Sequence, residues 1–323
     1  MRGLPETPDA EKALRQGQRL AWLTIAYLVS TVFLLFMVMG GSQALKTELV
    51  EDSLSFIPPV LFLVSDRISR REPNQKYPFG YERAVSTGYI GAALALFAVG
   101  VFLIFDGAMK LAMQEHPTIG GFPLFGAVVW TGWLAIPVLL WCAIPAHFLG
   151  RAKRGTAQTL HDKTLAADAE MNEANWQSAG SAILGIVGVS FGLWWADAAA
   201  GVLISLEIIR SGWVELRVAL GDVMDRRPMT LEEKEDDPIS DRLVRFLRSQ
   251  PWVRDVVVRV RERGRELTAE AHVVPKADQI SIDEVSRTGV LACKIDPRLA
   301  EVTIAPVKAL PSDVAKARQS ADA

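Results

Sequence analysis

Six long apolar runs, separated by short polar stretches, occupy the first two thirds of the 323-residue chain. They lie at about residues 20–39, 45–64, 84–113, 123–149, 163–195 and 197–216. At about 1.5 Å per residue, each run is long enough to cross a bilayer core of ~30 Å as a helix. The pattern therefore predicts an all-α membrane bundle of six transmembrane helices.

The hydrophobic pattern changes after residue 217. Residues 239–249 and 282–291 have helical spacing, whereas residues 253–260, 267–274 and 300–305 are typical of strands, with a turn at 261–264. The order αββαβ predicts a small two-layer, ferredoxin-like α+β domain. We therefore expect an N-terminal segment at 1–19, the six-helix domain at 20–217, a linker at 218–238, the αββαβ domain at 239–308 and a flexible tail at 309–323.

Composition supports this division into two parts. Half of the residues are hydrophobic (50%) and 22% are charged, which is too apolar for one soluble domain and too charged for a membrane bundle alone. The net charge of −2 identifies no class of partner. The two cysteines, Cys142 and Cys293, have no metal-binding or disulfide spacing, and we interpret both as buried thiols.

Basic residues predict the orientation in the membrane. They concentrate before the first run and between runs two and three and runs four and five, whereas the alternate loops hold little more than Lys46 and Lys110. By the positive-inside rule, both termini are cytoplasmic and the chain is an integral protein of the inner (plasma) membrane. The N-terminal segment also lacks the short basic start of a secretory signal, so we expect it to be cytoplasmic.

The second run is the strongest candidate for a functional site, because it contains three acids, Glu48, Glu51 and Asp52. A carboxylate inside the hydrocarbon costs roughly 2.5–3.5 kcal/mol on insertion scales, so it should face a bundle interior or a wet cavity and mark an ion path. Helical spacing places Glu48, Asp52, Ser55 and Phe56 on one face, with Glu51 well round the side.

A double proline follows these acids, at positions 58 and 59. Proline has no backbone N–H, so the carbonyl oxygens of Leu54 and Ser55 lose their helical partners about one turn from Asp52. Inside a membrane such oxygens must be satisfied by neighbouring helices, by water or by a bound cation.

The fifth run begins in polar sequence. On its helical wheel one face carries Asp168, Met171, Asn172 and Asn175, and the opposite side carries Glu170 and Glu173. We expect the first set to face the bundle core. Two interpretations of Asp168 stay open, because an acid near a helix N-terminus also stabilises the helix dipole. For Met171, packing is the more common role of such a side chain.

Ion pairing is the alternative to an ion path. The only basic residue well inside a run is Arg210, which has Glu207 three positions before it, so pairing of Arg210 with Asp52 is the weaker interpretation. Near the end of the third run, Asp106 and Lys110 have the spacing of an interfacial ion pair. Asp197 has the position of a cap for the sixth helix.

These features together resemble one known family. The chain is similar to cation diffusion facilitators in five features. These are Asp52-Ser-Leu in the second helix, the loop Tyr77-Pro-Phe-Gly-Tyr-Glu-Arg83, Ala167-Asp168 opening the fifth helix, Ala196-Asp197 at the sixth and a final αββαβ domain. The resemblance covers nearly the whole chain. It implies a dimeric exchanger of divalent metal cations for protons.

The family's transport site has four ligands, two on the second helix and two on the fifth. The flanking motifs place these positions at Asp52 and Phe56 and at Met171 and Asn175. Only Asp52 keeps a carboxylate, so the resemblance implies a site of Asp52, Asn175 and Met171, supplemented by Glu48, Ser55 or Asp168. An offset of one residue would bring in Glu51 or Asn172. Such donors suit a weakly held or harder cation better than tightly bound zinc.

The αββαβ domain also departs from the family pattern. Family members often bind metal there through several histidines, whereas His272 stands alone on its predicted strand. We expect a domain that dimerises without a dense metal cluster.

Two functional hypotheses follow. The first is a secondary transporter that exports a divalent cation of unspecified identity from the cytoplasm in exchange for protons, as a homodimer in contact with membrane lipid. The second is a membrane protein of the same fold whose transport site has degenerated and which acts as a regulatory or dimer-partner subunit. An enzyme is not expected, since no phosphate loop, nucleophile elbow or paired catalytic histidine is present; neither a cofactor nor nucleic-acid binding is expected.

Overall fold

The computed structural model describes residues 8–38, 43–114, 121–124, 127–191, 193, 195–231 and 235–310. It divides into two compact units, one formed by residues 12–220 and the other by residues 221–323 together with 1–11. The proposed tail at 309–323 lies almost wholly outside the described residues, as does the start of the N-terminal segment.

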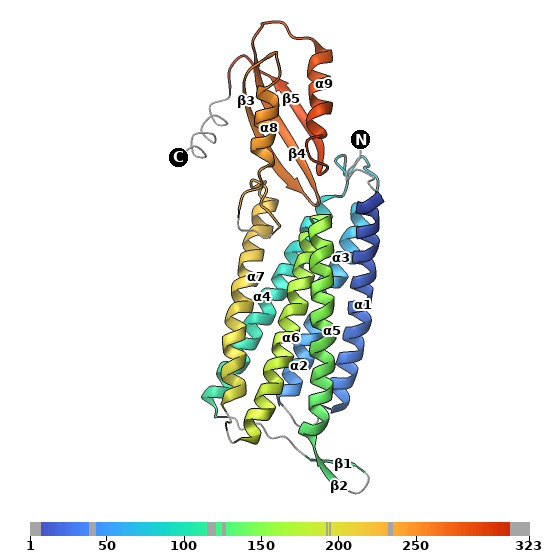
Figure 1. Ribbon diagram of the computed structural model, residues 1–323, viewed down its shortest axis with the longest axis vertical. Coiled ribbons are helices and arrows are strands. Elements are labelled where there is room, and N and C mark those ends of the chain that lie inside the picture. Colours follow the sequence, from blue (N-terminus) through green and yellow to red (C-terminus); the bar gives the residue numbers. More distant parts are fainter. Residues whose placement is uncertain are drawn as a thin grey trace. The chain divides into compact units, whose positions relative to one another are not determined.

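The first unit is a bundle of helices (Figure 1). Its members are α1 (Pro8–Val38), α2 (Gln43–Leu54), α3 (Ile57–Ser69), α4 (Arg83–Ala112), α5 (Thr131–Leu160), α6 (Lys163–Ser190) and α7 (Ala196–Val223). Three of the described helices are long and apolar enough to cross a membrane, at Glu11–Val38, Arg83–Ala112 and Leu134–Leu160. The prediction of six transmembrane helices therefore stays a prediction for the other three.

We expected the second apolar run to form one continuous helix, but it forms two. Helix α2 ends at Leu54, and α3 begins at Ile57 with a proline in its first turn. A proline is tolerated there because the first N–H groups of a helix have no intrahelical acceptor. The double proline thus ends one helix and starts the next, directly after the three acids.

Other elements differ from the bounds of the apolar runs. Helix α1 begins at Pro8, so residues 8–19 of the proposed N-terminal segment are helical, and the cytoplasmic location of this segment stays a prediction. The fourth run does not begin at residue 123, because a hairpin of β1 (Gly121–Leu124) and β2 (Ala127–Trp130) precedes α5. Helix α5 then continues to Leu160, eleven residues beyond the predicted end at 149.

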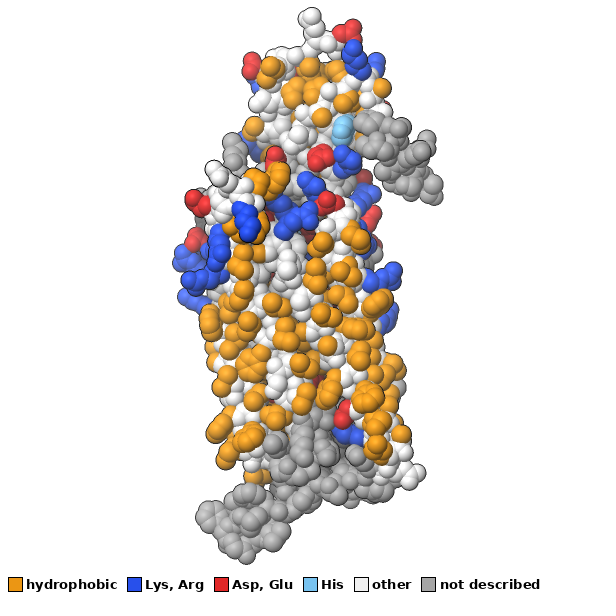
Figure 2. Space-filling view, turned by 180° about the vertical axis from the view of Figure 1, so that it is seen from behind, with side chains coloured by type: hydrophobic (Ala, Val, Ile, Leu, Met, Phe, Trp, Pro, Cys, Tyr) orange, Lys and Arg blue, Asp and Glu red, His pale blue; other side chains and the backbone are white. Residues whose placement is uncertain are grey.

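The outer surface of this bundle is apolar over most of its length, and Figure 2 shows basic side chains gathered toward one end of it. Large exposed apolar side chains occur on several helices, including Phe33, Phe36, Phe105, Phe148 and Leu184. An apolar surface of this extent would be a liability in water but matches a lipid environment.

Close contact between α4 and α7 depends on glycine. A Cβ added at Gly100 would lie 2.8 Å from the backbone nitrogen of Ile209, and one at Gly212 would lie 2.7 Å from the Cα of Phe97. Real Cβ atoms do not approach backbone this closely, so the two helices pack together only because both positions lack a side chain.

The second unit has the predicted order αββαβ. Its elements are α8 (Ile239–Arg248), β3 (Val253–Arg263), β4 (Glu266–Pro275), α9 (Ile282–Cys293) and β5 (Leu299–Pro306). The sheet order is β3-β4-β5, with β3 and β4 antiparallel and β4 and β5 parallel. Strand β3 runs further than predicted, because the turn is made by Gly264 and Arg265 rather than by residues 261–264; Gly264 has a φ of 69°.

Alternate residues of the strands face α8 and α9 and form the core of this unit. That core includes Ile239 and Leu243 from α8, Leu267 and Ala269 from β4, and Ala292 from α9. Burial of these side chains supplies the main favourable free energy for packing the helices on the sheet.

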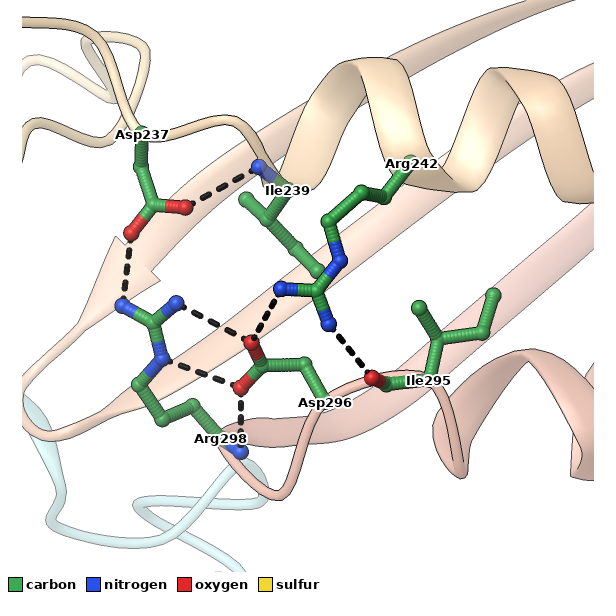
Figure 3. A network of polar contacts seen from close by, with 6 residues as sticks. All are labelled: Asp237, Ile239, Arg242, Ile295, Asp296 and Arg298. Carbon is green, nitrogen blue, oxygen red and sulfur yellow. Dashed lines mark hydrogen bonds and ion pairs between the residues drawn. The ribbon is translucent and has the colours of Figure 1, made fainter.

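A polar network ties the start of α8 to the loop before β5 (Figure 3). Asp237 accepts a hydrogen bond from the backbone N–H of Ile239 at 3.0 Å and one from Arg298 Nη1 at 2.6 Å. Arg298 also bonds to Asp296, and Arg242 donates to the carbonyl oxygen of Ile295 at 2.6 Å. Burial alone would raise the pKa of Asp296, but its hydrogen bonds and charge interactions with Arg298 and Arg242 lower that pKa overall.

Candidate cation site

Three acidic side chains on α2 are buried inside the bundle. The exposed fractions of Glu48, Glu51 and Asp52 are 3%, 1% and 1%. Buried carboxylates need a proton, a cation or hydrogen-bond donors. Helical phase places Glu51 to the side of the face that Glu48 and Asp52 share, and the structure buries it as well, so all three acids lie inside the bundle.

Ser178 on α6 contacts two of these carboxylates with one hydroxyl group. Its Oγ lies 3.2 Å from Glu48 Oε2 and 2.6 Å from Glu51 Oε2. A serine hydroxyl has one hydrogen to donate and cannot serve both oxygens at once. Two carboxylates that share such a donor are stabilised when one of them carries a proton or when a cation neutralises their charge.

A second contact joins the end of α2 to α6. The Oγ of Ser55 lies 2.9 Å from Asn175 Oδ1 and 2.9 Å from the carbonyl oxygen of Glu51. Its single hydrogen can be donated to only one of them. Asn175 is 1% exposed, and its Nδ2 has no partner among the described residues. The amide oxygen of Asn175 therefore has lone-pair capacity left for a cation.

Asp52 lies where α2 meets α1 and α5. The side chains of Thr31 and Cys142 lie beside its carboxylate, and the Tyr27 hydroxyl donates to the carbonyl oxygen of Cys142. Among the described residues, Asp52 Oδ2 and Glu51 Oε1 have no hydrogen-bond partner. Unpaired, buried carboxylate oxygens are costly unless a proton or a cation occupies them in some state of the protein.

The donor set restricts what could be held here. Within the ranges that the structure describes, no group of three or more His, Cys, Asp or Glu side chains is arranged to hold a metal ion. A cation would therefore take two carboxylates at most and complete its coordination with neutral oxygens of Asn175, Ser55 or Ser178. All of these donors are oxygens, which is the set preferred by hard divalent cations.

Comparison with known proteins agrees with this membrane architecture. The model of the cation efflux transmembrane domain matches residues 20–224, which is well over half of the chain. The chain belongs to the cation efflux family. It is therefore an integral membrane protein of a family of cation transporters.

Several characterised members are similar to this chain. The manganese efflux system protein MneS of Bacillus subtilis (strain 168) is 28% identical over 260 residues, which cover 76% of this chain and 84% of that protein. The zinc transporter ZitB of Escherichia coli (strain K12) is 25% identical over 282 residues, covering 85% and 81%. The metal cation efflux system protein CzcD of Cupriavidus metallidurans is 24% identical over 211 residues, covering 64% and 62%.

Asp168 does not join the acids of α2 but forms a buried ion pair. Its Oδ2 lies 2.6 Å from Lys153 Nζ on α5, and the side chains of the two residues are 1% and 0% exposed. Neither sequence interpretation of Asp168 included this partner. The sequence predicts Lys153 in a loop, but it lies in α5 and is fully buried; Arg210 lies within α7, as predicted, and is exposed.

Two of the positions that the sequence resemblance predicts as ligands hold side chains that pack with apolar neighbours. Met171 is 1% exposed and lies in a cluster with Leu96, Val99 and Ile208. Phe56 packs against a cluster that includes Tyr27. The structure thus brings Glu48, Glu51, Asp52 and Asn175 together, and it leaves Met171 and Asp168 with other partners.

The opposite faces of α6 have separate environments, as its wheel predicts. Asp168, Asn172 and Asn175 are buried, whereas Glu170 and Glu173 are half-exposed and both pair with Arg154. The Asp106–Lys110 ion pair is confirmed, with Oδ2 and Nζ 2.5 Å apart.

Sequence reasoning missed Ser178 and the contact of Cys142 with Asp52, whereas the prediction that Cys142 is a buried thiol is confirmed and Cys293 is only half-buried. Ser178 lies three positions after Asn175 and seven after Met171, so its helical phase already placed it on the inward face of α6. No sequence signal placed Cys142 beside Asp52, because that contact depends on how α5 is rotated in the bundle. In the other unit, His272 lies on β4 between Val257 and Ala305 of the neighbouring strands.

Proposed function

We propose that this protein is a secondary transporter that exports a divalent metal cation from the cytoplasm in exchange for protons. The observation that carries the proposal is the contact of one hydroxyl, Ser178 Oγ, with two buried carboxylates, Glu48 and Glu51, next to the unpartnered oxygen of Asp52. Such a cluster is stable either protonated or cation-bound. Alternation between those two states is what an exchanger needs.

In this mechanism Asp52 and Glu51 bind the cation while deprotonated and take up protons after its release. Ser178 holds the carboxylates together in both states, by donating to a carboxylate or accepting from a carboxylic acid. Rocking of the helices around α2 and α6 exposes the site to each side of the membrane in turn.

The oxygen donors favour a hard cation, and we propose Mn²⁺ as the first one to test. One similar protein is named for manganese efflux and another for zinc. Tetrahedral zinc sites are built from Cys, His and carboxylate ligands, whereas Mn²⁺ accepts carboxylate, amide and hydroxyl oxygens. The thiol of Cys142, a soft donor, lies beside Asp52, but the remaining donors of this set are oxygens.

The working form that we propose is a homodimer with six transmembrane helices per chain and both termini in the cytoplasm. The three apolar spans and the apolar outer surface support membrane insertion. The broken pair α2–α3 together with α6 and α7 would complete the six. The basic residues near the ends of α3 and α5 support the orientation.

A second candidate is a subunit of the same fold that does not transport. The packing of Phe56 and Met171 against apolar side chains favours it, because two family ligand positions then contribute no donor. Asp52 Oδ2 and Glu51 Oε1, which have no hydrogen-bond partner among the described residues, favour transport instead.

Purified protein in proteoliposomes tests the proposal. Metal uptake and internal pH are followed with Mn²⁺, Zn²⁺, Fe²⁺ and Co²⁺ supplied separately, for wild type, Asp52→Asn and Asp106→Asn. The last variant is the control, because Asp106 is an acid in a membrane helix that pairs with Lys110 far from α2 in the sequence.

Metal-dependent proton movement in wild type and Asp106→Asn, lost in Asp52→Asn, is the expected result. Equal transport by Asp52→Asn would overturn the assigned site. No flux with any metal from a folded dimer would favour the non-transporting subunit.

A further inference from the structure

The Lys153–Asp168 pair is unusual because a lysine is completely buried within a helix that qualifies as a membrane span. Lys153 lies in the span Leu134–Leu160 and is 0% exposed, and its Nζ is 2.6 Å from Asp168 Oδ2. A buried ion pair gives little net stability, since the cost of removing two charges from water offsets most of their attraction. Ionisable residues buried between the helices of a membrane protein are candidates for a role in ion movement.

Asp168 lies on the same face of α6 as the acidic site. Asp168, Asn172, Asn175 and Ser178 follow one another at spacings of four, three and three residues, so they form one line along the helix. The first three are each no more than 2% exposed. From Asp168 to Ser178 this line spans about 15 Å. It is polar throughout and ends at the carboxylates of Glu48 and Glu51.

Asn172 lies in the middle of this line and has unused hydrogen-bonding capacity. Its side chain is buried, and its Nδ2 has no partner among the described residues. Because its amide group is not fully used by described residues, the Asn172 side chain can bind a water molecule or a passing ion.

Close packing of α5 on α6 brings Lys153 against this line. A Cβ at Gly150 would lie 3.2 Å from Asn172 Cβ and 3.2 Å from the carbonyl oxygen of Ala169. The absence of a side chain at Gly150 therefore lets α5 approach α6 one turn before Lys153. The lysine then reaches Asp168 directly.

We propose that Lys153 is a tethered counter-cation of the transport route and that Asp168 is an intermediate station for the metal. The ammonium group occupies Asp168 when no metal is present. An incoming divalent cation displaces it, passes Asn172 and reaches the site at Asp52 and Glu51. Lys153 thereby prevents Asp168 from retaining the cation. This inference rests on the proposed transport function.

The two charges should then affect the apparent metal KM in opposite directions. Lys153→Met leaves a bare carboxylate, so metal is held more tightly and released more slowly: KM and kcat both fall. Asp168→Asn removes the station, so KM rises. The expected change in KM is about fivefold or more in each case, as for typical coupling between sites. A purely structural pair would change the amount of folded protein but not KM.

The test measures initial rates of Mn²⁺ uptake into proteoliposomes over a range of metal concentrations, with folding checked by size-exclusion chromatography. The double variant Lys153→Gln/Asp168→Asn keeps a neutral pair that can hydrogen-bond. If either single variant fails to fold, this double variant tests the proposal by itself. Its KM for Mn²⁺ should rise, as in Asp168→Asn. The double variant Asp106→Asn/Lys110→Gln is the matched control, because it removes another lysine–aspartate pair.

Opposite shifts in KM for the single variants, or a raised KM for the neutral double variant beside an unchanged control, support the proposal. Wild-type KM and kcat in the neutral double variant overturn it. If the wild type transports none of the four metals, the proposed function itself fails. That failure can be told apart from a failure of the Lys153–Asp168 proposal, because it is seen before any variant is compared.

Discussion

Ser55 and Asn175 are 120 positions apart in the sequence, yet Ser55 Oγ lies 2.9 Å from Asn175 Oδ1. This buried contact fixes the last residues of the broken helix against α6. It places the side chain of Asn175, a ligand predicted from the sequence, against the end of the helix that carries the acids. A polar pair in this position has lone pairs left over for a cation, which an apolar pair would not have.

Replacing Asn175 with aspartate should strengthen metal binding and broaden the range of metals. Asn175→Asp adds a charged oxygen donor, which zinc coordination favours. We expect a lower KM for Mn²⁺ and measurable transport of Zn²⁺ in proteoliposomes. Asn175→Leu, which has a similar volume and no donor, is the companion variant and should raise KM. Identical KM values for the two variants would argue that residue 175 does not contact the metal.

Ser178→Ala should impair transport while leaving the fold intact. The variant removes the one hydroxyl shared by Glu48 and Glu51. A lost hydrogen bond to a charged group costs roughly 1.5–3 kcal/mol, so we expect transport at sub-saturating metal to fall about tenfold or more.

Ser65→Ala is the control for this change. Ser65 is also a buried serine in a helix of the bundle, but its hydroxyl donates to the carbonyl of Phe62 in its own helix. Unchanged rates in Ser178→Ala, or an equal loss in Ser65→Ala, would show that the shared hydroxyl has no special part in transport.

Substitution of the glycines between α4 and α7 should destabilise the bundle. Gly100→Ala and Gly212→Ala each put a methyl group within 2.8 Å of backbone atoms on the facing helix. The helices must separate, at a cost of about 1–3 kcal/mol, as in other overpacked interiors. Thermal unfolding in detergent should show a lower midpoint for both variants.

Gly155→Ala and Gly180→Ala provide the matched comparison. Both glycines are in helices, and nothing lies within 4 Å of a Cβ added at either one. Since alanine favours helix by roughly 0.5–1 kcal/mol over glycine, these variants should be as stable as wild type or more so. Destabilisation of all four variants alike would refute the packing argument.

Acid should loosen the network around Asp296 in the αββαβ unit. Its hydrogen bonds from Arg298 and the charge of Arg242 lower the pKa of Asp296 below its ordinary value of 3.8. A carboxyl group with a lowered folded-state pKa stabilises the fold fully above the unfolded pKa. That contribution is lost as the pH falls from about 5 through the folded-state pKa.

Hydrogen exchange of the full chain measures this effect in peptides from α9 and β5, with correction for intrinsic exchange rates. Asp296→Asn should reduce protection at pH 7, and its difference from wild type should shrink toward pH 3. Asp283→Asn, at the exposed start of α9, serves as the control. A difference between Asp296→Asn and wild type that does not depend on pH would contradict the charge argument.

The sequence by itself determined the order of elements and the chemical character of the site. Apolar runs and strand alternation depend only on local periodicity, so α4, α8, α9 and the strands β3, β4 and β5 were found close to their observed bounds. Acids and prolines inside an apolar run are costly wherever the helix packs, so they already marked the region of Glu48, Glu51 and Asp52. The buried face of α6 followed from its helical phase for the same reason.

Only the tertiary structure decided which of these groups meet. A helical wheel gives the phase of a residue on its own helix and nothing about the neighbouring one. The contacts of Ser178 with Glu48 and Glu51, and of Cys142 with Asp52, depend on the mutual rotation of packed helices. The same holds for Lys153: its charge suggested a loop, but the glycine three residues before it and the carboxylate of Asp168 make its burial possible.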